Sequence, residues 1–280
     1  MNPLRHIGRR HIHLETTDST NSHAAEFAHD PSLAGTVVTA DLQKQGRGQY
    51  GRVWESPPGT SILLSALLFP PPNLRRPAIL TAFVAVVVTE TILEVTGIQS
   101  QIKWPNDVLL RGKKICGILI ECGVAGRARS ASEGDDSSLA CASGSTERAP
   151  HAILGIGLNV NQSAEDFERM GLAHATSLSV VVGQRLNVKE TTRRLIGNLD
   201  EQYHRLLNGQ FEELEAYWTE RIGLVGQPVA VELMNATELR GQLTHMTFRE
   251  LTLLRADGQT LHLLPEEVRH LHAAESTRRQ

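Results

Sequence analysis

The segment Gln43–Gly59, QKQGRGQYGRVWESPPG, sets the interpretation of the whole chain. It contains three glycines within six positions, Gly46, Gly48 and Gly51, and arginines stand among them. Glycine lets a backbone adopt left-handed angles and approach a ligand closely, and arginine offers a planar set of donors that suits a carboxylate or phosphate. This composition predicts a mobile loop that folds over an anion. A basic surface loop without a ligand is the alternative.

The same glycines also fit the pattern G-x-G-x-x-G, but the residues that follow exclude a dinucleotide-binding loop. A Rossmann loop leads directly into a helix whose N-terminus faces the pyrophosphate. Here Pro57, Pro58 and Gly59 follow within a few residues and prevent such a helix. A P-loop is excluded as well, because no G-K-[ST] closes the pattern.

The composition is that of an ordinary soluble protein. Of the 280 residues, 40% are hydrophobic and 21% are charged, which is enough apolar material for a sizeable core. The formal net charge of -3 argues against nucleic acid as a partner of the whole molecule. Three cysteines without metal-ligand spacing, Cys116, Cys122 and Cys141, predict a reducing, cytoplasmic setting without disulfides.

No segment predicts export or membrane insertion. No apolar run follows the arginine pair at residues 9–10, so an export signal is not expected. The most apolar segment covers residues 77–95, but only residues 77–89 are free of charge, which is too short to span a bilayer. We therefore expect a buried helix, with proline at its start and Gly97 after its end.

Short apolar segments between turn residues predict a set of strands. We expect them at residues 10–16, 35–41, 60–69, on both sides of a hairpin turn at 111–113, and at 151–160. Further helices are expected at residues 189–207 and 210–221. Another should begin after Asp18-Ser19-Thr20-Asn21, where we interpret the hydroxyls as helix caps. His11 and His13 would share one strand face, as ordinary strand residues rather than metal ligands.

The residue composition changes at residues 123–150, and the spacing of predicted strands changes at Gly226. These two changes predict the domains. Residues 123–150 are rich in Gly, Ser, Ala and charge, which predicts a flexible insertion. From Gly226 onward, closely spaced strands with an Asp-Gly turn at 257–258 predict a β-barrel of about 50 residues. We therefore expect a large domain over residues 1–223, a small one over 224–273 and a tail over 274–280.

Four motifs in a fixed order carry a resemblance to a known family. They are Gly46-Arg47-Gly48…Gly51-Arg52-x-Trp54, Lys103-Trp104-Pro105-Asn106-Asp107, Lys114-x-x-Gly117-Ile118-Leu119-x-Glu121 and Gly155-x-Gly157-x-Asn159. Together they resemble the biotin–protein ligase family, from about Leu14 to His272. The resemblance implies an α+β fold: a catalytic domain with a mixed β-sheet, related to class II aminoacyl-tRNA synthetases, followed by a small SH3-like β-barrel. Only about a dozen residues precede the first predicted strand, so the DNA-binding domain of some members is not expected here.

The resemblance also implies an activity, that of a biotin–[acetyl-CoA-carboxylase] ligase (EC 6.3.4.15). Such an enzyme uses ATP and Mg²⁺ to convert biotin to biotinyl-5′-AMP with release of pyrophosphate. It then transfers the biotinyl group to one lysine of a biotin carboxyl carrier protein or domain. The sequence does not identify the acceptor carboxylase, and it leaves open whether the chain forms a homodimer.

The residues that match the motifs of the family are assigned roles by the resemblance. Because the reaction joins two anions, which repel by about 1 kcal/mol at 4 Å in water, positive charge must be in place beforehand. The resemblance implies catalytic roles for Arg47, Lys114 and Asp107, the last as a general base. It implies biotin binding by Ser19, Thr20, Asn21, Gln43, Gly46, Arg47, Gly48, Gln49 and Lys114. It implies ATP binding by Arg52, Trp54, Lys103, Asn106 and Asn159, and it identifies no protein ligand for Mg²⁺.

One position departs from the family, and two other interpretations stay open. Gln49 stands where many relatives have the second arginine of G-R-G-R, so the chain keeps a hydrogen-bonding group but loses a charge. This predicts some leakage of the adenylate.

A lipoate or octanoate ligase or transferase shares the catalytic fold and is the nearest alternative function. A non-catalytic biotin or adenylate sensor that acts through its β-barrel is the other.

Overall fold

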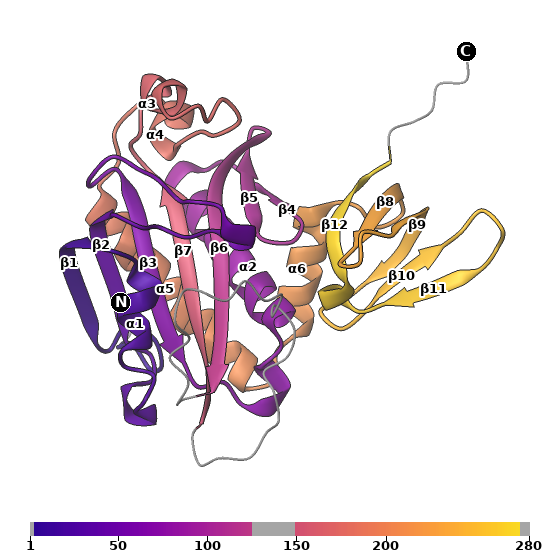
Figure 1. Cartoon of the computed structure of the whole chain (residues 1–280), viewed down its shortest axis with the longest axis horizontal. Coiled ribbons are helices and arrows are strands. Elements are labelled where there is room, and N and C mark those ends of the chain that lie inside the picture. Colours follow the sequence, from indigo (N-terminus) through magenta and orange to yellow (C-terminus); the bar gives the residue numbers. More distant parts are fainter. Residues whose placement is uncertain (1–2, 125–148, 275–280) are drawn as a thin grey trace.

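Two β-sheets of different size make up the protein. The computed structural model describes residues 3–124 and 149–274. A seven-stranded mixed sheet with helices on both faces is followed by a five-stranded antiparallel sheet near the C-terminus (Figure 1). This confirms the predicted α+β class. Most of the predicted insertion, Cys141 and nearly all of the tail lie outside the described residues.

The large sheet has the strand order β1-β2-β3-β7-β6-β5-β4. β1 and β2 run parallel, and every other neighbouring pair is antiparallel. The predicted strands are confirmed, and a short strand, β4, precedes the hairpin at the sheet edge: it ends at Lys103, and residues 104–106 form the turn that joins it to β5. The bounds are β1 (His11–Thr17), β2 (Val37–Gln43), β3 (Ser61–Leu68), β4 (Gln101–Lys103), β5 (Asp107–Leu110), β6 (Lys113–Val124) and β7 (Pro150–Asn159).

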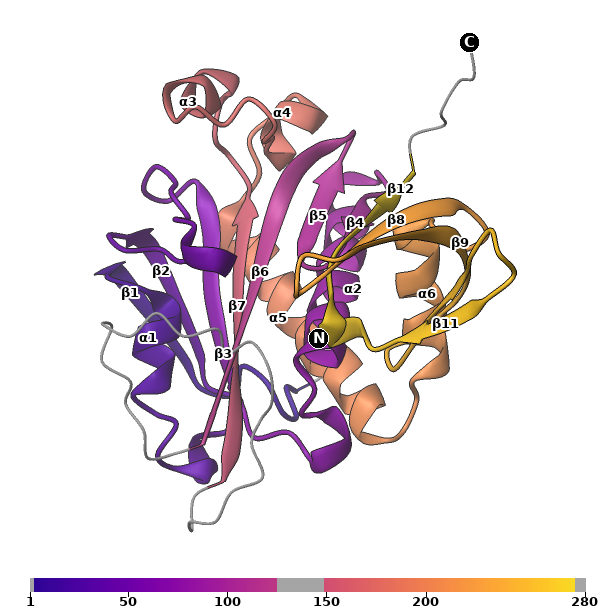
Figure 2. The same cartoon turned by 45° about the vertical axis from the view of Figure 1, so that its right-hand side comes forward.

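Helices cover the two faces of this sheet unequally. The short α1 lies against β2, β3 and β7 on one face, while the long α2 and α5 pack against each other and cover the opposite face (Figures 1 and 2). Two short helices, α3 and α4, were not predicted. The bounds are α1 (Thr20–Ala25), α2 (Pro77–Thr96), α3 (Ala164–Arg169), α4 (Leu178–Val182), α5 (Val188–Leu207) and α6 (Glu212–Ile222).

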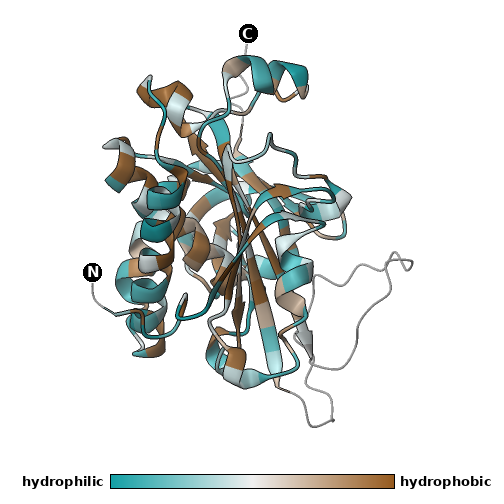
Figure 3. Ribbon diagram, turned by 90° about the vertical axis from the view of Figure 1, so that its left-hand side faces the viewer, coloured by the Kyte–Doolittle hydropathy of each residue, from teal (hydrophilic) through white to brown (hydrophobic). Residues whose placement is uncertain are grey.

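The main core lies between the sheet and the long helices. All eight residues of β3 are buried, and Figure 3 shows apolar residues concentrated along the central strands. The helix α2 has 20 residues and is long and apolar enough to cross a membrane, but 72% of its apolar window is buried inside the protein. The expectation of a buried helix is therefore confirmed. The argument that the segment is too short to span a bilayer was wrong, because the helix continues past its first glutamate.

The C-terminal sheet forms the small barrel expected from the sequence. Its strand order is β11-β10-β9-β8-β12, and all of its pairs are antiparallel. The predicted boundary between the domains falls in the segment that joins α6 to β8, and the division itself stays a prediction. The bounds are β8 (Pro228–Leu233), β9 (Glu238–Met246), β10 (Leu251–Leu254), β11 (Thr260–Leu263) and β12 (Val268–Ala273).

Trp104 of the Lys-Trp-Pro-Asn-Asp motif joins the barrel to the large sheet. Its side chain is buried, and its indole Nε1–H donates a hydrogen bond to the backbone oxygen of Val268, at 2.9 Å. Its ring packs against Trp218 with centroids 5.9 Å apart, and Trp218 in turn packs against Phe248 of the barrel at 5.3 Å. The tryptophan of this motif therefore packs the two parts together, and it also lines the cavity described below.

Truncation of Trp104 should destabilise the protein strongly. Trp104→Ala removes a buried aromatic ring and should lower the free energy of unfolding by about 3–5 kcal/mol. Trp104→Phe keeps most of the packing but leaves the Val268 carbonyl without its donor, which should cost about 1–3 kcal/mol. Leu254→Ala, at a residue 37% exposed on β10, should change stability by about 0.5 kcal/mol or less. Equilibrium denaturant unfolding measures all three, and a Trp104→Ala midpoint equal to that of wild type would contradict the assignment.

Candidate active site

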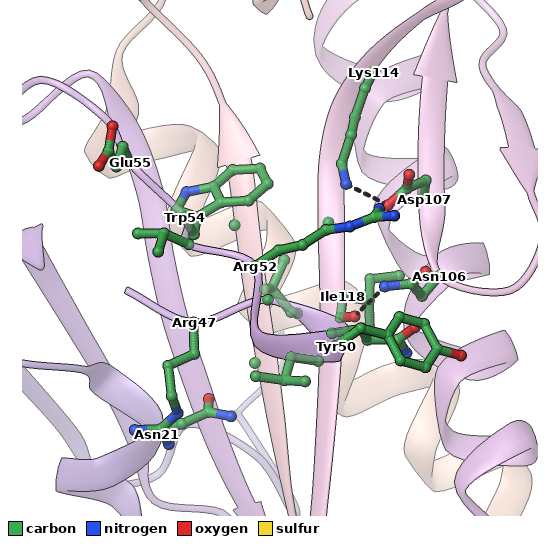
Figure 4. A pocket seen from close by; sticks show the side chains of 18 of the residues that line it. Asn21, Arg47, Tyr50, Arg52, Trp54, Glu55, Asn106, Asp107, Lys114 and Ile118 are labelled. Atoms are coloured by element: carbon green, nitrogen blue, oxygen red, sulfur yellow. Dashed lines mark hydrogen bonds and ion pairs between the residues drawn. The ribbon is translucent and has the colours of Figure 1, made fainter. Parts of the chain in front are cut away.

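A cavity of about 380 Å³ lies over the central strands of the large sheet. The glycine–arginine loop, the start of α1, the turn between β4 and β5, and the strands β6 and β7 supply its walls. Every residue assigned to the site from the sequence lines this cavity except Gly46. Figure 4 shows the cavity with its principal side chains. The structure therefore brings together residues that stand more than a hundred positions apart in the chain.

The glycine–arginine loop is a folded hairpin in this structure rather than an open segment. The amide of Gly48 donates to the carbonyl of Arg52 at 2.7 Å, and the amide of Trp54 donates to the carbonyl of Gly46 at 3.0 Å. A Cβ at Gly46 would lie 2.2 Å from the Trp54 carbonyl oxygen, so Gly46 is needed for this close approach. This explains why Gly46 shapes the loop without lining the cavity.

The barrel contributes to the cavity through β12, which sequence reasoning did not detect. The guanidinium of Arg269 lies over the ring of Tyr50 at the tip of the loop, 5.1 Å from the centroid. Its neighbour His270 lines the cavity. These two residues stand about 220 positions after the loop and carry no local motif, so only the fold reveals them.

The indole of Trp54 lies flat on two glycines of the sheet. Gly117 of β6 and Gly157 of β7 are direct cross-strand partners. A Cβ at Gly157 would lie 2.4 Å from Trp54 Cε2, and one at Gly117 would lie 2.8 Å from its Cζ3. The indole N–H of Trp54 is buried and has no hydrogen-bond partner among residues 3–124 and 149–274. The ring is thus held as a flat platform with an unused donor.

One end of the cavity holds a carboxylate between cations. Lys114 Nζ forms an ion pair with Asp107 Oδ1 at 2.6 Å, and Arg52 points toward the same carboxylate (Figure 4). Lys103 also lines the cavity. The turn that carries Asp107 is fixed to β6 by Asn106, whose Nδ2 donates to the Ile118 carbonyl at 2.9 Å while its own carbonyl accepts from the Ile118 amide at 3.0 Å.

The opposite end is a layer of buried polar groups. Gln43 Oε1 accepts from both the amide and the hydroxyl of Thr20, at 2.7 and 2.9 Å. Ser65 Oγ bonds to Thr20 Oγ1 at 2.8 Å and to Asn21 Oδ1 at 2.5 Å. Ser65 was missed because it stands inside an apolar strand. The capping interpretation was wrong, since Ser19 occupies the N-cap of α1 without a side-chain cap hydrogen bond, and the hydroxyls face the cavity layer instead.

Arg47 belongs to this polar end of the cavity. Its guanidinium donates to Ser22 Oγ at 2.6 Å and to both carboxylate oxygens of Glu121 at 3.0 Å. Figure 4 shows Arg47 directed toward Asn21 and away from Lys114. The resemblance implies catalytic roles for both Arg47 and Lys114, and the structure places the two side chains toward opposite ends of the cavity (Figure 4).

The glycines of the Gly155-x-Gly157-x-Asn159 motif leave space for neighbouring side chains, and its asparagine hydrogen-bonds to neighbouring residues. A Cβ at Gly155 would lie 2.5 Å from Asn21 Oδ1, so this glycine admits Asn21 as Gly157 admits the tryptophan. Asn159 lines the cavity, but its amide is already engaged: Nδ2 donates to the Thr176 carbonyl at 3.0 Å, and Oδ1 accepts from Gln162 at 2.8 Å. We infer that Asn159 mainly fixes the end of β7.

No metal centre is evident in the part of the chain that the structure describes. Within residues 3–124 and 149–274, no group of three or more His, Cys, Asp or Glu side chains could hold a metal ion. His11 and His13 share a strand face as predicted, and a ring nitrogen of each lies near Thr39 Oγ1, at 2.8 and 3.1 Å.

Comparison with known proteins agrees with this geometry. The model of the biotin/lipoate A/B protein ligase family matches residues 14–129. The bifunctional ligase/repressor BirA of Bacillus subtilis is 31% identical over 231 residues, which cover 82% of this chain and 65% of that protein. Biotin–[acetyl-CoA-carboxylase] ligase of Mycobacterium tuberculosis is 27% identical over 260 residues, which cover 91% of this chain and 86% of the relative. Over most of its length the chain is thus similar to biotin–protein ligases.

A solved structure of this family has the same fold. Biotin protein ligase from Aquifex aeolicus, in complex with biotin and ATP, superposes with a TM-score of 0.70 at 25% identity. The match covers 95% of this chain and all of that one, so it includes the large sheet and the barrel. The chain spans about two thirds of the length of the first BirA relatives, 65% in each case.

Alanine at Gly157 should disturb the platform under Trp54. Gly157→Ala forces its Cβ against the indole and should destabilise the protein by about 1–3 kcal/mol, as overpacking does. Gly197→Ala is the matched control, because Gly197 lies inside α5 with nothing within 4 Å of the place that a Cβ would take, and alanine there should stabilise by about 0.5–1 kcal/mol. Thermal unfolding separates the two variants. A Gly157→Ala protein that melts at or above the wild-type temperature would refute the packing.

Proposed function

We propose that the chain is an ATP-dependent biotin–protein ligase. It would join biotin to the adenylyl group of ATP, release pyrophosphate, and then transfer the biotinyl group to a lysine of a biotin carboxyl carrier domain. The observation that carries this proposal is the division of one cavity into a buried polar end and a cationic end. A carboxylic acid with a polar ring fits such a cavity.

The polar end favours biotin over lipoate or octanoate. The ureido ring of biotin has two N–H donors and a carbonyl acceptor, which can pair with the groups around Thr20 and Gln43. A dithiolane ring or an alkyl chain offers no partner to any donor or acceptor of this layer that its internal hydrogen bonds leave unpaired, at a cost of about 1–3 kcal/mol for each such group. Sites built to hydrogen-bond a substrate reject analogues that lack the polar atoms for this reason. The lipoate or octanoate alternative is therefore less well supported.

The cationic end suits the adenylation step. An oxygen of the biotin carboxylate attacks the α-phosphorus of ATP, a P–O bond to the acyl oxygen forms, and the P–O bond to pyrophosphate breaks. The two anions repel by about 1 kcal/mol at 4 Å in water and by several times as much in a drier site. Lys114, Arg52 and Lys103 line this region and supply the positive charge that offsets the repulsion.

Trp54 and an acidic residue of the cavity suit the nucleotide. The flat indole offers a stacking surface for adenine. The Mg²⁺ that accompanies ATP is held mainly by phosphates and water with one or two carboxylates. The donor set fits this, since Glu55 lines the cavity and can supply such a ligand. Bound there, the ion would neutralise phosphate charge.

In the transfer step a neutral lysine of the carrier attacks the acyl carbon and AMP leaves. The lysine must lose a proton, and Asp107 is the group that we assign to accept it. Its carboxylate is largely buried and already lies against Lys114, so it stands beside the atoms that react. The folded hairpin over the cavity helps to exclude water from the reactive anhydride.

Pyrophosphate exchange tests the function and the substrate together. With ATP and labelled pyrophosphate, biotin should support exchange, and lipoate or octanoate should not. Lys114→Ala should lower the rate by about 10²–10³-fold because it removes a charge from the transition state. Lys113, the exposed neighbour of Lys114 on the same strand, provides the control. Lys113→Ala should keep wild-type activity. Exchange with lipoate or octanoate would overturn the substrate, and no exchange with any acid would favour the sensor alternative.

Asp107→Asn should separate the two steps. Loss of the general base should slow transfer from preformed biotinyl-5′-AMP to a biotin carboxyl carrier domain by about 10²–10⁴-fold. Pyrophosphate exchange with biotin should remain within a few-fold of wild type. Single-turnover transfer and exchange assays on the same preparation measure the two rates. An equal loss in both assays would show that Asp107 acts by holding Lys114 instead.

A further inference from the structure

Glu121 contacts several elements at the polar end of the cavity. It stands on β6 on the same face as Gly117 and Leu119, which line the cavity, because alternate residues of a strand share a face. Its Oε2 accepts from Asn21 Nδ2 at 2.7 Å, and both of its carboxylate oxygens accept from Arg47 at 3.0 Å. One carboxylate thus connects the sheet to α1 and to the glycine–arginine loop.

The geometry of these contacts fixes orientation more than stability. Arg47 is 44% exposed and Glu121 is 37% exposed, and ion pairs of such groups add little to the stability of a fold. Nη2 of Arg47 contacts both carboxylate oxygens while Nη1 contacts Ser22, and these two attachments fix the direction and plane of a long, otherwise flexible side chain. Ser22 of α1 provides a further acceptor for the same guanidinium, at 2.6 Å.

Asn21 depends on the same carboxylate for its orientation. Its Oδ1 is bonded to Ser65, and its Nδ2 is bonded to Glu121, so the amide group is held at both ends. Gly155 leaves the space in which it lies, since a Cβ there would be 2.5 Å from Asn21 Oδ1. Removal of Glu121 would leave this amide free to rotate beside the polar layer.

We propose that Glu121 is the positioning residue for the polar end of the cavity. It holds Arg47 and Asn21 in place and so sets the affinity for the polar ring of the acid substrate, while it acts only through those two side chains. This inference rests on the proposed function. It assigns Glu121 no part in ATP binding or in the chemical step, which belong to the opposite end of the cavity.

The first experiment measures biotin binding and kinetics. Glu121→Gln keeps an acceptor for Asn21 but loses the charge, and Glu121→Ala removes both contacts. The dissociation constant for biotin should rise by about tenfold in the glutamine variant and further in the alanine variant. The KM for biotin in pyrophosphate exchange should rise in parallel, with kcat and the KM for ATP unchanged. Glu15→Gln, at an exposed carboxylate of β1, is the control and should match wild type.

A second experiment needs no substrate. Native trypsin cleavage after Arg47, followed by mass spectrometry, should be faster in Glu121→Gln than in wild type, because the guanidinium is released. Cleavage after Arg111, at the exposed hairpin tip, serves as the internal reference. In an Arg47→Ala background, Glu121→Gln should weaken biotin binding much less than it does in the wild-type background.

The two experiments separate this inference from the proposed function. Wild-type protein that binds no biotin would refute the proposed function, while the cleavage assay would still decide whether Glu121 anchors Arg47. Wild-type affinity and wild-type cleavage in Glu121→Gln would overturn the inference. So would a fall in melting temperature large enough to explain the lost affinity, or a lower kcat at unchanged KM for biotin.

Discussion

The close approach of Trp54 to the sheet is the contact on which the site depends. An indole can lie flat on an antiparallel pair only where both strands lack side chains, and Gly117 and Gly157 are direct partners across β6 and β7. The loop that carries Trp54 is closed by backbone hydrogen bonds, so its position follows from the position of the ring. Two glycines therefore determine where the arginines of the loop lie.

An ion pair lies at each end of the cavity, and the two ends differ in the step that they suit. Asp107 lies against Lys114 at one end, and Glu121 lies against Arg47 at the other. A half-buried cation with a carboxylate beside it keeps a fixed direction, which is what a preorganised site requires. The separation is also chemical: the end that is mainly hydrogen bonds suits recognition of a ring, and the end with several cations suits the union of two anions.

The motifs predicted which residues line the cavity, because each motif lies in a short segment whose residue types have specific uses. Glycines, an N-cap hydroxyl and a Lys-Trp-Pro-Asn-Asp turn are visible without a structure, and nearly all of the assigned residues do line one cavity. The elements of the fold were also predictable where periodicity was strong. The short helices α3 and α4 have too few residues for such a signal, and they were missed.

The sequence could not predict contacts between residues that are far apart in the chain. Ser65 sits in an apolar strand, and its role depends on α1 packing above it. The hydroxyls near α1 were interpreted as caps because local pattern favours caps, yet Gln43 and Ser65 compete successfully for them. Trp104 stands within a sequence motif, but only the fold shows that it is buried against Trp218. Tertiary contact overrode local preference in each of these positions.

The strand β12 links the two principal motifs through three consecutive residues. The carbonyl of Val268 accepts from Trp104, Arg269 lies over Tyr50, and His270 lines the cavity. The Lys-Trp-Pro-Asn-Asp turn and the glycine–arginine loop thus rest on one short segment of the barrel, although neither is near it in sequence. A displacement of the barrel would alter both walls of the cavity together. The barrel is therefore part of the architecture of the site, and its attachment through Trp104 bears on the geometry of the loop as well as on stability.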